Sequence, residues 1–289
     1  MIAITGANGN LGKLIVKGLL KKLPASQIVA AVRDPQKSVD LRDLGVEVRN
    51  ADYDRPETLF EAFTGIEKLL LISAVVPGER FRQHKAVIDA AKQAGVELVG
   101  YTSMLRADTS TMLLAAEHKR TEDYLNETGL TFVLLRNGWY LENHTGGLAA
   151  ALAHGSIMGC SGHGRFASAS RSDYAEAAIT VLTEPGHENK TYELAGDHSF
   201  SMYEFADEVS KQAHRTVVYN DVTSTEYKAA LLGFGLPQMI VDVVIDADLK
   251  SMNGDLDSSS RDLSKLIGRH TTNVSEAIRA ALASNVKQE

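Results

Sequence analysis

The sequence predicts an α/β fold, a doubly wound parallel sheet with a smaller helix-rich C-terminal lobe. Two observations predict it. Apolar runs alternate with helical patterns as far as Arg136, which is typical of parallel strands joined by right-handed crossovers. Residues 1–12 have the pattern of a short strand, a glycine turn and the start of a helix. After Arg136 the alternation stops, so we expect the lobe to begin near there.

The first half of the chain supplies six expected strands. They end at Thr5 or cover residues 27–33, 46–48, 68–73, 98–102 and 131–136. The helices expected after the first one cover residues 35–43, 57–63, 80–94 and 113–127. The run 68–73 is apolar nearly throughout, as expected for a sheet covered on both faces. Within the helix at 80–94, we expect His84 and Lys85 to be solvated. Six strands in two halves form the Rossmann-like arrangement that binds dinucleotides.

The second half is richer in helices. A helix is expected at 172–182, a strand at 190–194, and further helices at 202–213, 224–232, 237–248 and 273–283. We therefore expect a dinucleotide-binding domain over residues 1–140, with segments near 166–196 returning to the sheet. A smaller substrate-binding lobe would cover residues 141–289, and the cleft between the two would hold the substrate.

Composition narrows the class of protein. The chain has 289 residues, of which 44% are hydrophobic, and its formal net charge is −7. The negative charge disfavours a nucleic-acid partner. The single cysteine, Cys160, excludes an internal disulfide and fits a reducing compartment. No apolar run is long enough for a membrane span, and the expected N-terminal strand leaves no room for a signal peptide. We expect a cytoplasmic protein.

The glycine turn carries a specific chemistry. Gly6 allows a sharp turn off the strand, Gly9 lets a pyrophosphate approach the backbone, and Gly12 lets the helix pack close to the strand. The helix N-terminus then offers free N–H groups to the phosphates. The alternative is a purely structural turn, but the position between a strand and a helix favours a bound dinucleotide.

The end of the second strand indicates which dinucleotide. An acidic residue there would bind a ribose diol and favour NAD, whereas this chain has Arg33, with Lys37 four residues later. The two cations can hold a 2′-phosphate, which favours NADPH and leaves NADH as a weaker cofactor. Asp34 complicates this assignment, because it can bind a diol or cap the helix that starts at Pro35. The alternative is that Arg33 and Lys37 are solvated surface charges.

The substrate is indicated by a missing motif. None of the nine tyrosines has a lysine four residues later, so the tyrosine–lysine machinery for carbonyl and alcohol chemistry is absent from the sequence. Substrates that accept a hydride without a strong protein acid fit better, such as quinones, iminium-like dyes and other conjugated electrophiles. The histidines lack zinc-ligand spacing, and Gly-x-Ser-x-Gly is absent, so neither a metal site nor a hydrolase is supported.

Three stretches follow strand ends, where ligands bind in such sheets. They begin at Ser73, at Thr102 and at Asn137, and the third contains the only tryptophan, Trp139. Trp139 fits either a nicotinamide pocket or packing between the lobes. The amide of Asn143 can hydrogen-bond a substrate carbonyl. Lys119 can reach a ribose or a substrate oxygen, or it can form an ordinary helical pair with Asp123.

These residues carry a family resemblance. The chain resembles the NmrA-like atypical short-chain dehydrogenases, and within them the bacterial NAD(P)H:quinone oxidoreductases of type 2 and the related triphenylmethane reductases. The likeness rests on residues 4–12, 32–35, 51–53 and 134–140, and extends through 101–103, 107–110, 117–118, 142–143, 192–197 and 263–268. The glycine motif is widely shared, and the later stretches are more discriminating.

The resemblance implies an NADPH-dependent quinone reductase without flavin or metal. Together with the residue arguments above, it gives cofactor-binding roles to Gly6, Ala7, Asn8, Gly9, Asn10, Leu11, Gly12, Arg33, Lys37, Ser73, Ala74, Thr102, Ser103, Asn137, Gly138, Trp139, Tyr140, Leu141 and Glu142. It implies catalytic roles for Asn143 and Lys119. Residues 74–77 are more apolar than in the quinone reductases, which leaves the substrate open.

Two alternatives stay open beside the quinone reductase. One is an NADP(H)-binding redox sensor of NmrA type that controls a partner protein without turnover. The other is a reductase of dyes and other conjugated electrophiles. For the quinone reductase and the dye reductase alike, the expected partner is a small planar molecule. The sequence leaves open whether the chain is a monomer or a homodimer.

Overall fold

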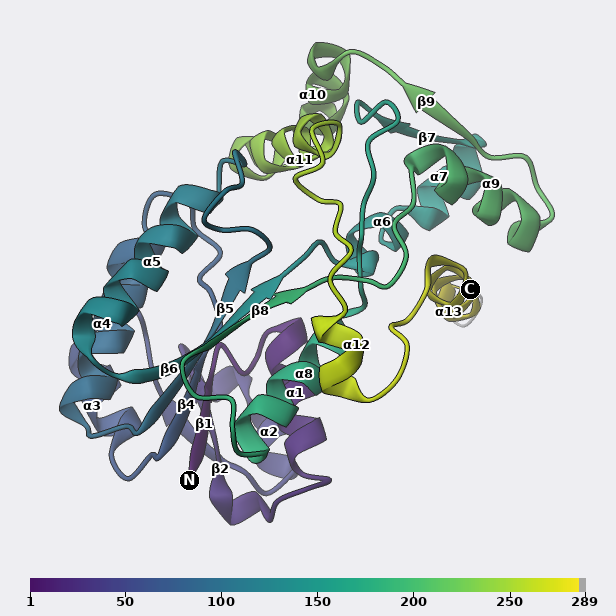
Figure 1. Ribbon diagram of the computed structural model, residues 1–289. Coiled ribbons are helices and arrows are strands. Elements are labelled where there is room, and N and C mark those ends of the chain that lie inside the picture. The colour runs from purple at the N-terminus through teal and green to yellow at the C-terminus, as the bar shows by residue number, and fades with distance from the viewer. Residues whose placement is uncertain (286–289) are drawn as a thin grey trace.

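The computed structural model describes residues 1–285 and contains a parallel sheet of seven strands. Its order is β3-β2-β1-β4-β5-β6-β8 (Figure 1). The strands are β1 (Ile2–Thr5), β2 (Ile28–Val32), β3 (Glu47–Asn50), β4 (Lys68–Leu71), β5 (Leu98–Met104), β6 (Thr131–Asn137) and β8 (Lys190–Leu194). The parallel, doubly wound sheet predicted from the alternation is confirmed, and the strand at 190–194 extends it beyond β6.

The strand order reverses at β1. This strand pairs with β2 on one side, where Ile2 is opposite Ile28, and with β4 on the other, where Ile2 is opposite Lys68. The switch point of the sheet therefore lies between β1 and β4, at the carboxyl edge. Open α/β sheets bind their ligands in the crevice at this point.

Helices cover both faces of the sheet (Figure 1). One face carries α1 (Asn10–Leu19), α8 (Arg171–Thr183) and α12 (Asp262–Ile267), and the other carries α3 (Glu57–Phe63), α4 (Arg80–Gln93) and α5 (Ala115–Thr128). A Cβ on Gly18 of α1 would lie 2.2 Å from Cδ1 of Ile179, so α1 and α8 pack closely. The strands are buried on both sides, which explains their continuous apolar runs.

Three short segments lie at the rim of the sheet. The 3₁₀ helices η1 (Ala25–Gln27) and η2 (Pro35–Lys37) flank β2, and α2 (Val39–Asp43) follows η2. The helix expected over residues 35–43 is thus split in two at Ser38.

The rest of the chain forms a second cluster around its own core. It contains α6 (Leu141–Thr145), α7 (Leu148–His154), α9 (Met202–Ala213), α10 (Ser224–Gly233), α11 (Gln238–Ser251) and α13 (Val274–Asn285). A small parallel pair joins β7 (Ser156–Gly159) to β9 (Val218–Asp221). Phe166, Phe200 and Phe205 lie at the centre of this core. The strands β7 and β9 and the helices α6, α7 and α12 were not expected from the sequence.

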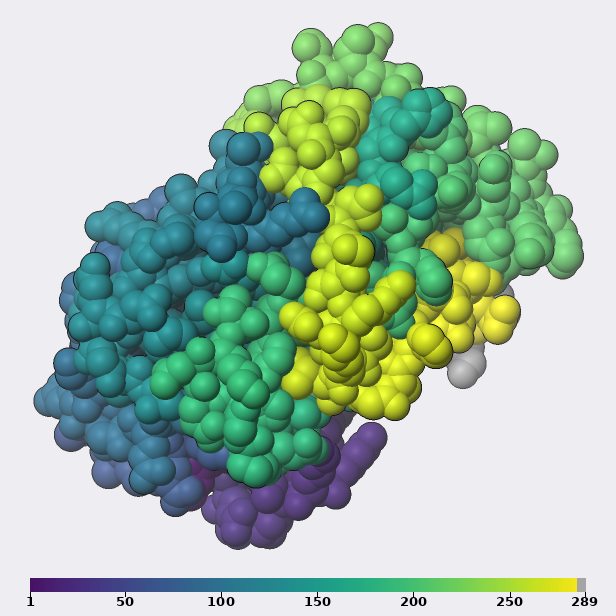
Figure 2. All heavy atoms as spheres, in the orientation of Figure 1, coloured from purple at the N-terminus to yellow at the C-terminus, as the bar shows by residue number. Residues whose placement is uncertain are grey.

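The two parts are connected more than once. The chain leaves the sheet after β6, returns for α8 and β8, and crosses again before α12, which lies on the sheet. Figure 2 shows the yellow C-terminal residues running across this face from one part to the other. The division into 1–140 and 141–289 stays a prediction. Within residues 1–285, no helix is both long and apolar enough to cross a lipid bilayer.

Candidate functional site

The glycine turn has the geometry that its spacing predicts. Gly6 has φ +59°, a left-handed conformation that favours glycine, and the N–H of Gly9 donates to its carbonyl at 2.9 Å. A Cβ on Gly12 would lie 2.5 Å from the Gly6 oxygen and 2.7 Å from Cα of Ala7. The start of α1 therefore packs against the turn as closely as only glycine permits.

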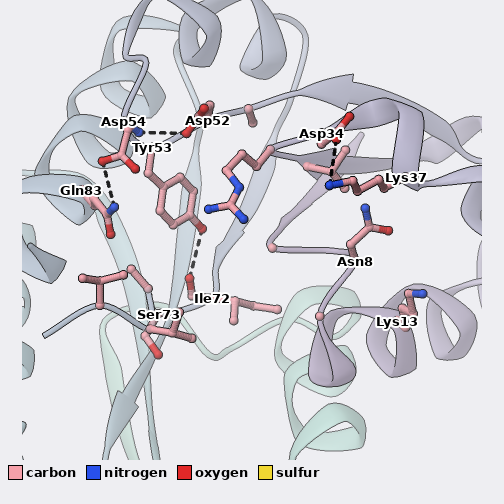
Figure 3. A pocket seen from close by; sticks show the side chains of 18 residues that line it. Asn8, Lys13, Asp34, Lys37, Asp52, Tyr53, Asp54, Ile72, Ser73 and Gln83 are labelled. Atoms are coloured by element: carbon pink, nitrogen blue, oxygen red, sulfur yellow. Dashed lines mark hydrogen bonds and ion pairs between the residues drawn. The ribbon is translucent and has the colours of Figure 1, made fainter. Parts of the chain in front are cut away.

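A cavity of about 550 Å³ opens beside this turn (Figure 3). It lies at the carboxyl edge, between the ends of β1, β2, β3 and β4. It is lined by Gly6, Asn8, Gly9, Lys13, Val32, Arg33, Asp34, Lys37, Ala51, Asp52, Tyr53, Asp54, Ile72, Ser73, Ala74, Val75, Val76 and Gln83. Seven of the predicted cofactor-binding residues are among them: Gly6, Asn8, Gly9, Arg33, Lys37, Ser73 and Ala74.

The outer end of the cavity is cationic. Arg33 and Lys37 are exposed there, and Lys37 lies 3.6 Å from the Asp34 carboxylate with 82% of its side chain exposed. Asp34 accepts a hydrogen bond from the backbone N–H of Gln36, so it caps η2. This is the capping role considered for Asp34 from the sequence. The arrangement leaves Arg33 and Lys37 available to an anionic group.

The floor of the cavity is a buried hydroxyl network. The Tyr53 hydroxyl donates to the Ile72 carbonyl at 3.0 Å and contacts the Thr5 hydroxyl. Thr5 in turn accepts from the N–H of Ile72 at 3.0 Å and donates to the Leu70 carbonyl. Burial raises the pKa of Tyr53, so it stays a neutral phenol. The network ties β3 to both strands of the switch point.

The loop after β4 is held from below by α4 and α5. The N–H of Ala74 donates to Nε2 of His84 at 2.8 Å, and its carbonyl accepts from Nε of Arg80 at 2.8 Å. Arg80 also pairs with Glu117, whose carboxylate accepts from the N–H of Gly78. The rim of the cavity is thus fixed by buried side chains, although Val75 on it is 80% exposed.

The expectation that His84 is solvated is wrong. Its side chain is fully buried, and Nδ1 lies 3.0 Å from the Thr121 hydroxyl. Because that hydroxyl donates to the Glu117 carbonyl, it accepts from Nδ1–H of His84, which leaves Nε2 as the acceptor for Ala74. Burial, and next the charge of Arg80, lowers the pKa of His84 to about 3. The imidazole is therefore neutral near pH 7.

Thr102 and Ser103 lie below the cavity at the end of β5, buried and bound to other groups of the protein. Thr102 accepts from the N–H of Ser73 at 2.9 Å, and Ser103 donates to Glu122 at 2.6 Å. Glu122 also pairs with Arg136 at the end of β6, at 2.7 Å. These contacts position the strand ends, and whether Thr102 or Ser103 touches a cofactor stays a prediction.

Residues after β6 continue the carboxyl edge but do not line the cavity. Asn137 is 8% exposed, and the N–H of Gly138 donates to the Leu194 carbonyl at 2.8 Å. Trp139 packs against the second core, as one of its two interpretations expected, and Leu141 is buried in that core. The Tyr140 ring lies under a guanidinium group from α8, 4.9 Å from its centre.

The two predicted catalytic residues have different surroundings. Asn143 is exposed, and its Oδ1 accepts from Arg171 at 3.1 Å. Glu142 accepts from the backbone N–H of Arg171 at 2.9 Å, which holds α6 against the start of α8. Lys119 pairs with Asp123 on α5 and does not line the cavity, which agrees with its structural alternative. A catalytic role for either stays a prediction.

The remaining predicted residues surround the turn. Ala7, Leu11 and Gly12 are buried beneath it, and Asn10 is exposed at the first position of α1.

Three unpartnered acceptors support a ligand at this edge. In the described part of the chain, buried side-chain oxygen or nitrogen atoms without a hydrogen-bond partner occur at Asn8, Gln83 and Asn137. Buried polar atoms are nearly always paired in native proteins. Two of the three border the cavity, and the third ends β6 on the same edge. The glycine cradle, the cations and these acceptors together fit a dinucleotide.

The sequence interpretation missed part of this wall. Tyr53 appeared only within the resemblance, and Gln83 was not singled out, although both line the cavity. Gln83 is a polar residue on a predominantly polar helix, so no local pattern indicates that it is buried. Among residues 1–285, no group of three or more His, Cys, Asp or Glu side chains is placed to hold a metal ion.

Comparisons with known proteins agree with this geometry. A family model described as NAD(P)H-binding matches residues 6–185. The chain is 48% identical to quinone oxidoreductase 2 of Escherichia coli (strain K12), over 96% of this chain and 97% of that one. A solved structure of an Escherichia coli NADPH-dependent quinone oxidoreductase with NADPH has a TM-score of 0.95 at 47% identity, covering 98% and 100% of the two chains. Triphenylmethane reductase of Citrobacter sp. with NADP(H) has a TM-score of 0.94 at 39% identity, covering 97% and 100%.

Proposed function

Because the chain belongs to the NAD(P)H-binding, NmrA-like family, we propose that it is an NADPH-dependent quinone oxidoreductase. The observation that carries the proposal is its 48% identity to quinone oxidoreductase 2 of Escherichia coli over nearly the full length of both chains. The geometry supports it, because a glycine turn, two cations and a cavity meet at the switch point of the sheet.

Different residues would hold different parts of the cofactor. The turn formed by Gly6 and Gly9 would hold the pyrophosphate with backbone N–H groups. Arg33 and Lys37 would hold the 2′-phosphate, which makes NADPH the preferred cofactor and NADH a weaker one. Residues 73–76 and 137–142 would bound the nicotinamide and its ribose.

Bound NADPH supplies a hydride, so that one quinone and one proton are converted to a hydroquinone as NADP⁺ forms. The contribution of the protein is to bind and orient the substrate. Asn143 has its oxygen turned to Arg171, so its Nδ2–H group faces the other way and can donate to a substrate carbonyl oxygen. This bond stabilises charge on that oxygen, which the aromatic product ring also delocalises. No strong protein acid is required, and the proposal includes neither flavin nor metal.

Lys119 is kept as a second candidate contact to the substrate or the ribose. Its pairing with Asp123 gives it an ordinary structural role as well. A cytoplasmic location and a substrate-binding lobe after residue 140 are part of the same proposal.

The experiment is NADPH oxidation by the purified protein with p-benzoquinone and alkyl-substituted benzoquinones, with and without added flavin. Turnover that needs no flavin supports the proposal. Tight and unequal binding of NADP⁺ and NADPH without turnover of any acceptor would instead support the redox sensor.

A reductase of dyes is the second candidate, and the 39% identity to triphenylmethane reductase favours it. The apolar residues Val75 and Val76 at the cavity rim are compatible with a large aromatic substrate. A panel containing triphenylmethane dyes beside the quinones separates the two, because the better substrate class has the higher kcat/KM.

A further inference from the structure

The wall of the cavity contains an amide whose oxygen has no partner. Gln83 lies on the first turn of α4, is 7% exposed and borders the cavity beside Tyr53 (Figure 3). Its Nε2 donates to Oδ1 of Asp54 at 2.9 Å. Since a carboxylate only accepts, this bond fixes the orientation of the amide and assigns the other position to oxygen. That atom, Oε1, is buried and unpaired within the described chain.

The orienting contact is itself held in place. Asp54 also accepts from Arg82 at 2.5 Å, and the bonds from Gln83 and Arg82 lower the pKa of the Asp54 carboxyl group. Asp54 therefore stays ionised near neutral pH and continues to accept from Nε2. The amide cannot rotate to present its N–H groups to the cavity without placing Oε1 against this carboxylate.

The ligand group beside Gln83 must then be a donor. The phosphates of a dinucleotide offer only acceptors, so they cannot pair with this oxygen. The charge of Arg33, the proposed partner of the 2′-phosphate, contributes to the lowered pKa of Asp54, so Gln83 lies toward the adenosine end of the proposed cofactor. Tyr53 and the carboxylate of Asp54 lie beside Gln83 on this wall (Figure 3). A flat aromatic ring with an exocyclic amino group matches this combination, and adenine is the part of NADPH that has one.

We propose that Gln83 accepts a hydrogen bond from the 6-amino group of adenine and so selects adenine over 6-oxopurine dinucleotides. A 6-oxopurine has a carbonyl oxygen at this position, which would face the Gln83 oxygen without a proton between them. An unpaired acceptor facing a mismatched ligand discriminates more strongly than the gain from one matched bond. The proposal rests on the NADPH-binding function proposed above.

The test compares NADPH with deamino-NADPH, in which hypoxanthine replaces adenine. The dissociation constant of each is measured by titration calorimetry in the absence of quinone. We expect the wild-type protein to bind deamino-NADPH about tenfold more weakly. Gln83→Met keeps the length of the side chain but removes the acceptor, so the ratio of the two constants should fall at least about threefold.

Lys85→Gln is the matched control. It changes a partly exposed cation of the same helix that pairs with Asp89 and does not line the cavity, so the ratio should stay at the wild-type value. Asp54→Ala removes the group that orients the amide, so the ratio should fall without a change at Gln83. This second variant serves where Gln83→Met fails to fold by circular dichroism.

Equal binding of the two dinucleotides by the wild-type protein overturns the proposal, as does an unchanged ratio in folded Gln83→Met or Asp54→Ala. Failure of the wild-type protein to bind either dinucleotide overturns the proposed function and this inference with it. Binding with discrimination but without quinone turnover supports the role of Gln83 and contradicts the reductase alone.

Discussion

The substitution Gly12→Ala tests the cofactor cradle directly. The new Cβ would lie 2.5 Å from the Gly6 oxygen and 2.7 Å from Cα of Ala7, both of them backbone atoms that cannot rotate away. The turn and the helix must separate by at least about 0.5 Å before these contacts reach 3.0 Å, the shortest that real Cβ atoms show. Overpacking of this kind costs about 1–3 kcal/mol. In a chain of this size, that cost lowers Tm by roughly 2–5 °C.

The separation also moves the N–H groups that would hold the pyrophosphate. Misplacing one or two charge-assisted bonds costs about 1.5–3 kcal/mol, so the Kd for NADPH should rise roughly 10- to 100-fold. The assay is calorimetric titration with NADPH, together with thermal unfolding. Gly233→Ala is the matched control, because its Cβ would meet nothing within 4 Å and its φ is not positive. Gly12→Ala with wild-type affinity for NADPH would refute the reasoning.

Three further predictions concern specificity, catalysis and pH. Arg33→Ala removes one of the two exposed cations at the cavity rim and should raise KM for NADPH roughly tenfold or more, while KM for NADH stays nearly unchanged. Equal effects in steady-state kinetics would contradict the 2′-phosphate role. Asn143→Ala should lower kcat about tenfold with p-benzoquinone, since one donor to the substrate oxygen is lost, while the Kd for NADPH is retained; an unchanged kcat would remove Asn143 from the proposal. Burial lowers the pKa of His144 to about 3, below the value of about 6.5 expected in the unfolded chain, so its contribution to stability is present above pH 6.5 and is lost as pH falls from there toward 3. His144→Gln should therefore reduce the slope of the unfolding free energy against pH by about 1.4 kcal/mol per pH unit between pH 6 and 4. The free energies are measured by urea unfolding at each pH. An identical slope in both proteins would show that the pKa of His144 does not differ between the folded and unfolded states.

The sheet and the turn could be predicted because their physical requirements leave a local trace. A strand buried on both faces has to be apolar, so β4 and β6 are visible as runs. The turn needs a positive φ at Gly6 and a close approach at Gly12, and only glycine meets both requirements.

The residues of the cavity wall on α4 could not be predicted from a local sequence pattern. The buried residues of α4 include Arg80, Gln83 and His84, so the helix has a polar sequence and yet lies under the loop after β4. Burial there depends on hydrogen bonds to Ala74 of the preceding loop and on Glu117 of α5, which is distant in the sequence. Periodicity records only apolar burial, and this explains why His84 was expected in solvent and Gln83 was not expected at the site.

Short elements were missed for a different reason. The strands β7 and β9 have four residues each, and α6 has five. β1, β3 and β4 also have four residues, but they were recognised within the regular alternation of strands and helices, which ends after Arg136. β7, β9 and α6 lie after it, and each is too short for a period of its own to be recognised. Their stability comes from packing on the second core, through residues such as Leu141 and Tyr219.

The late arrival of β8 affects how the protein can be made. Its pairing partner β6 ends at Asn137, whereas β8 begins at Lys190. At a synthesis rate of roughly 5–20 residues per second, synthesis of the intervening residues takes roughly 3–10 seconds, and β6 has no β8 to pair with until then. During that interval a seven-residue strand with four consecutive apolar residues, Phe132–Leu135, presents a row of unpaired N–H and C=O groups to other nascent chains. The excursion of the chain between β6 and β8 thus creates a period of aggregation risk during translation, which ends when β8 pairs with β6.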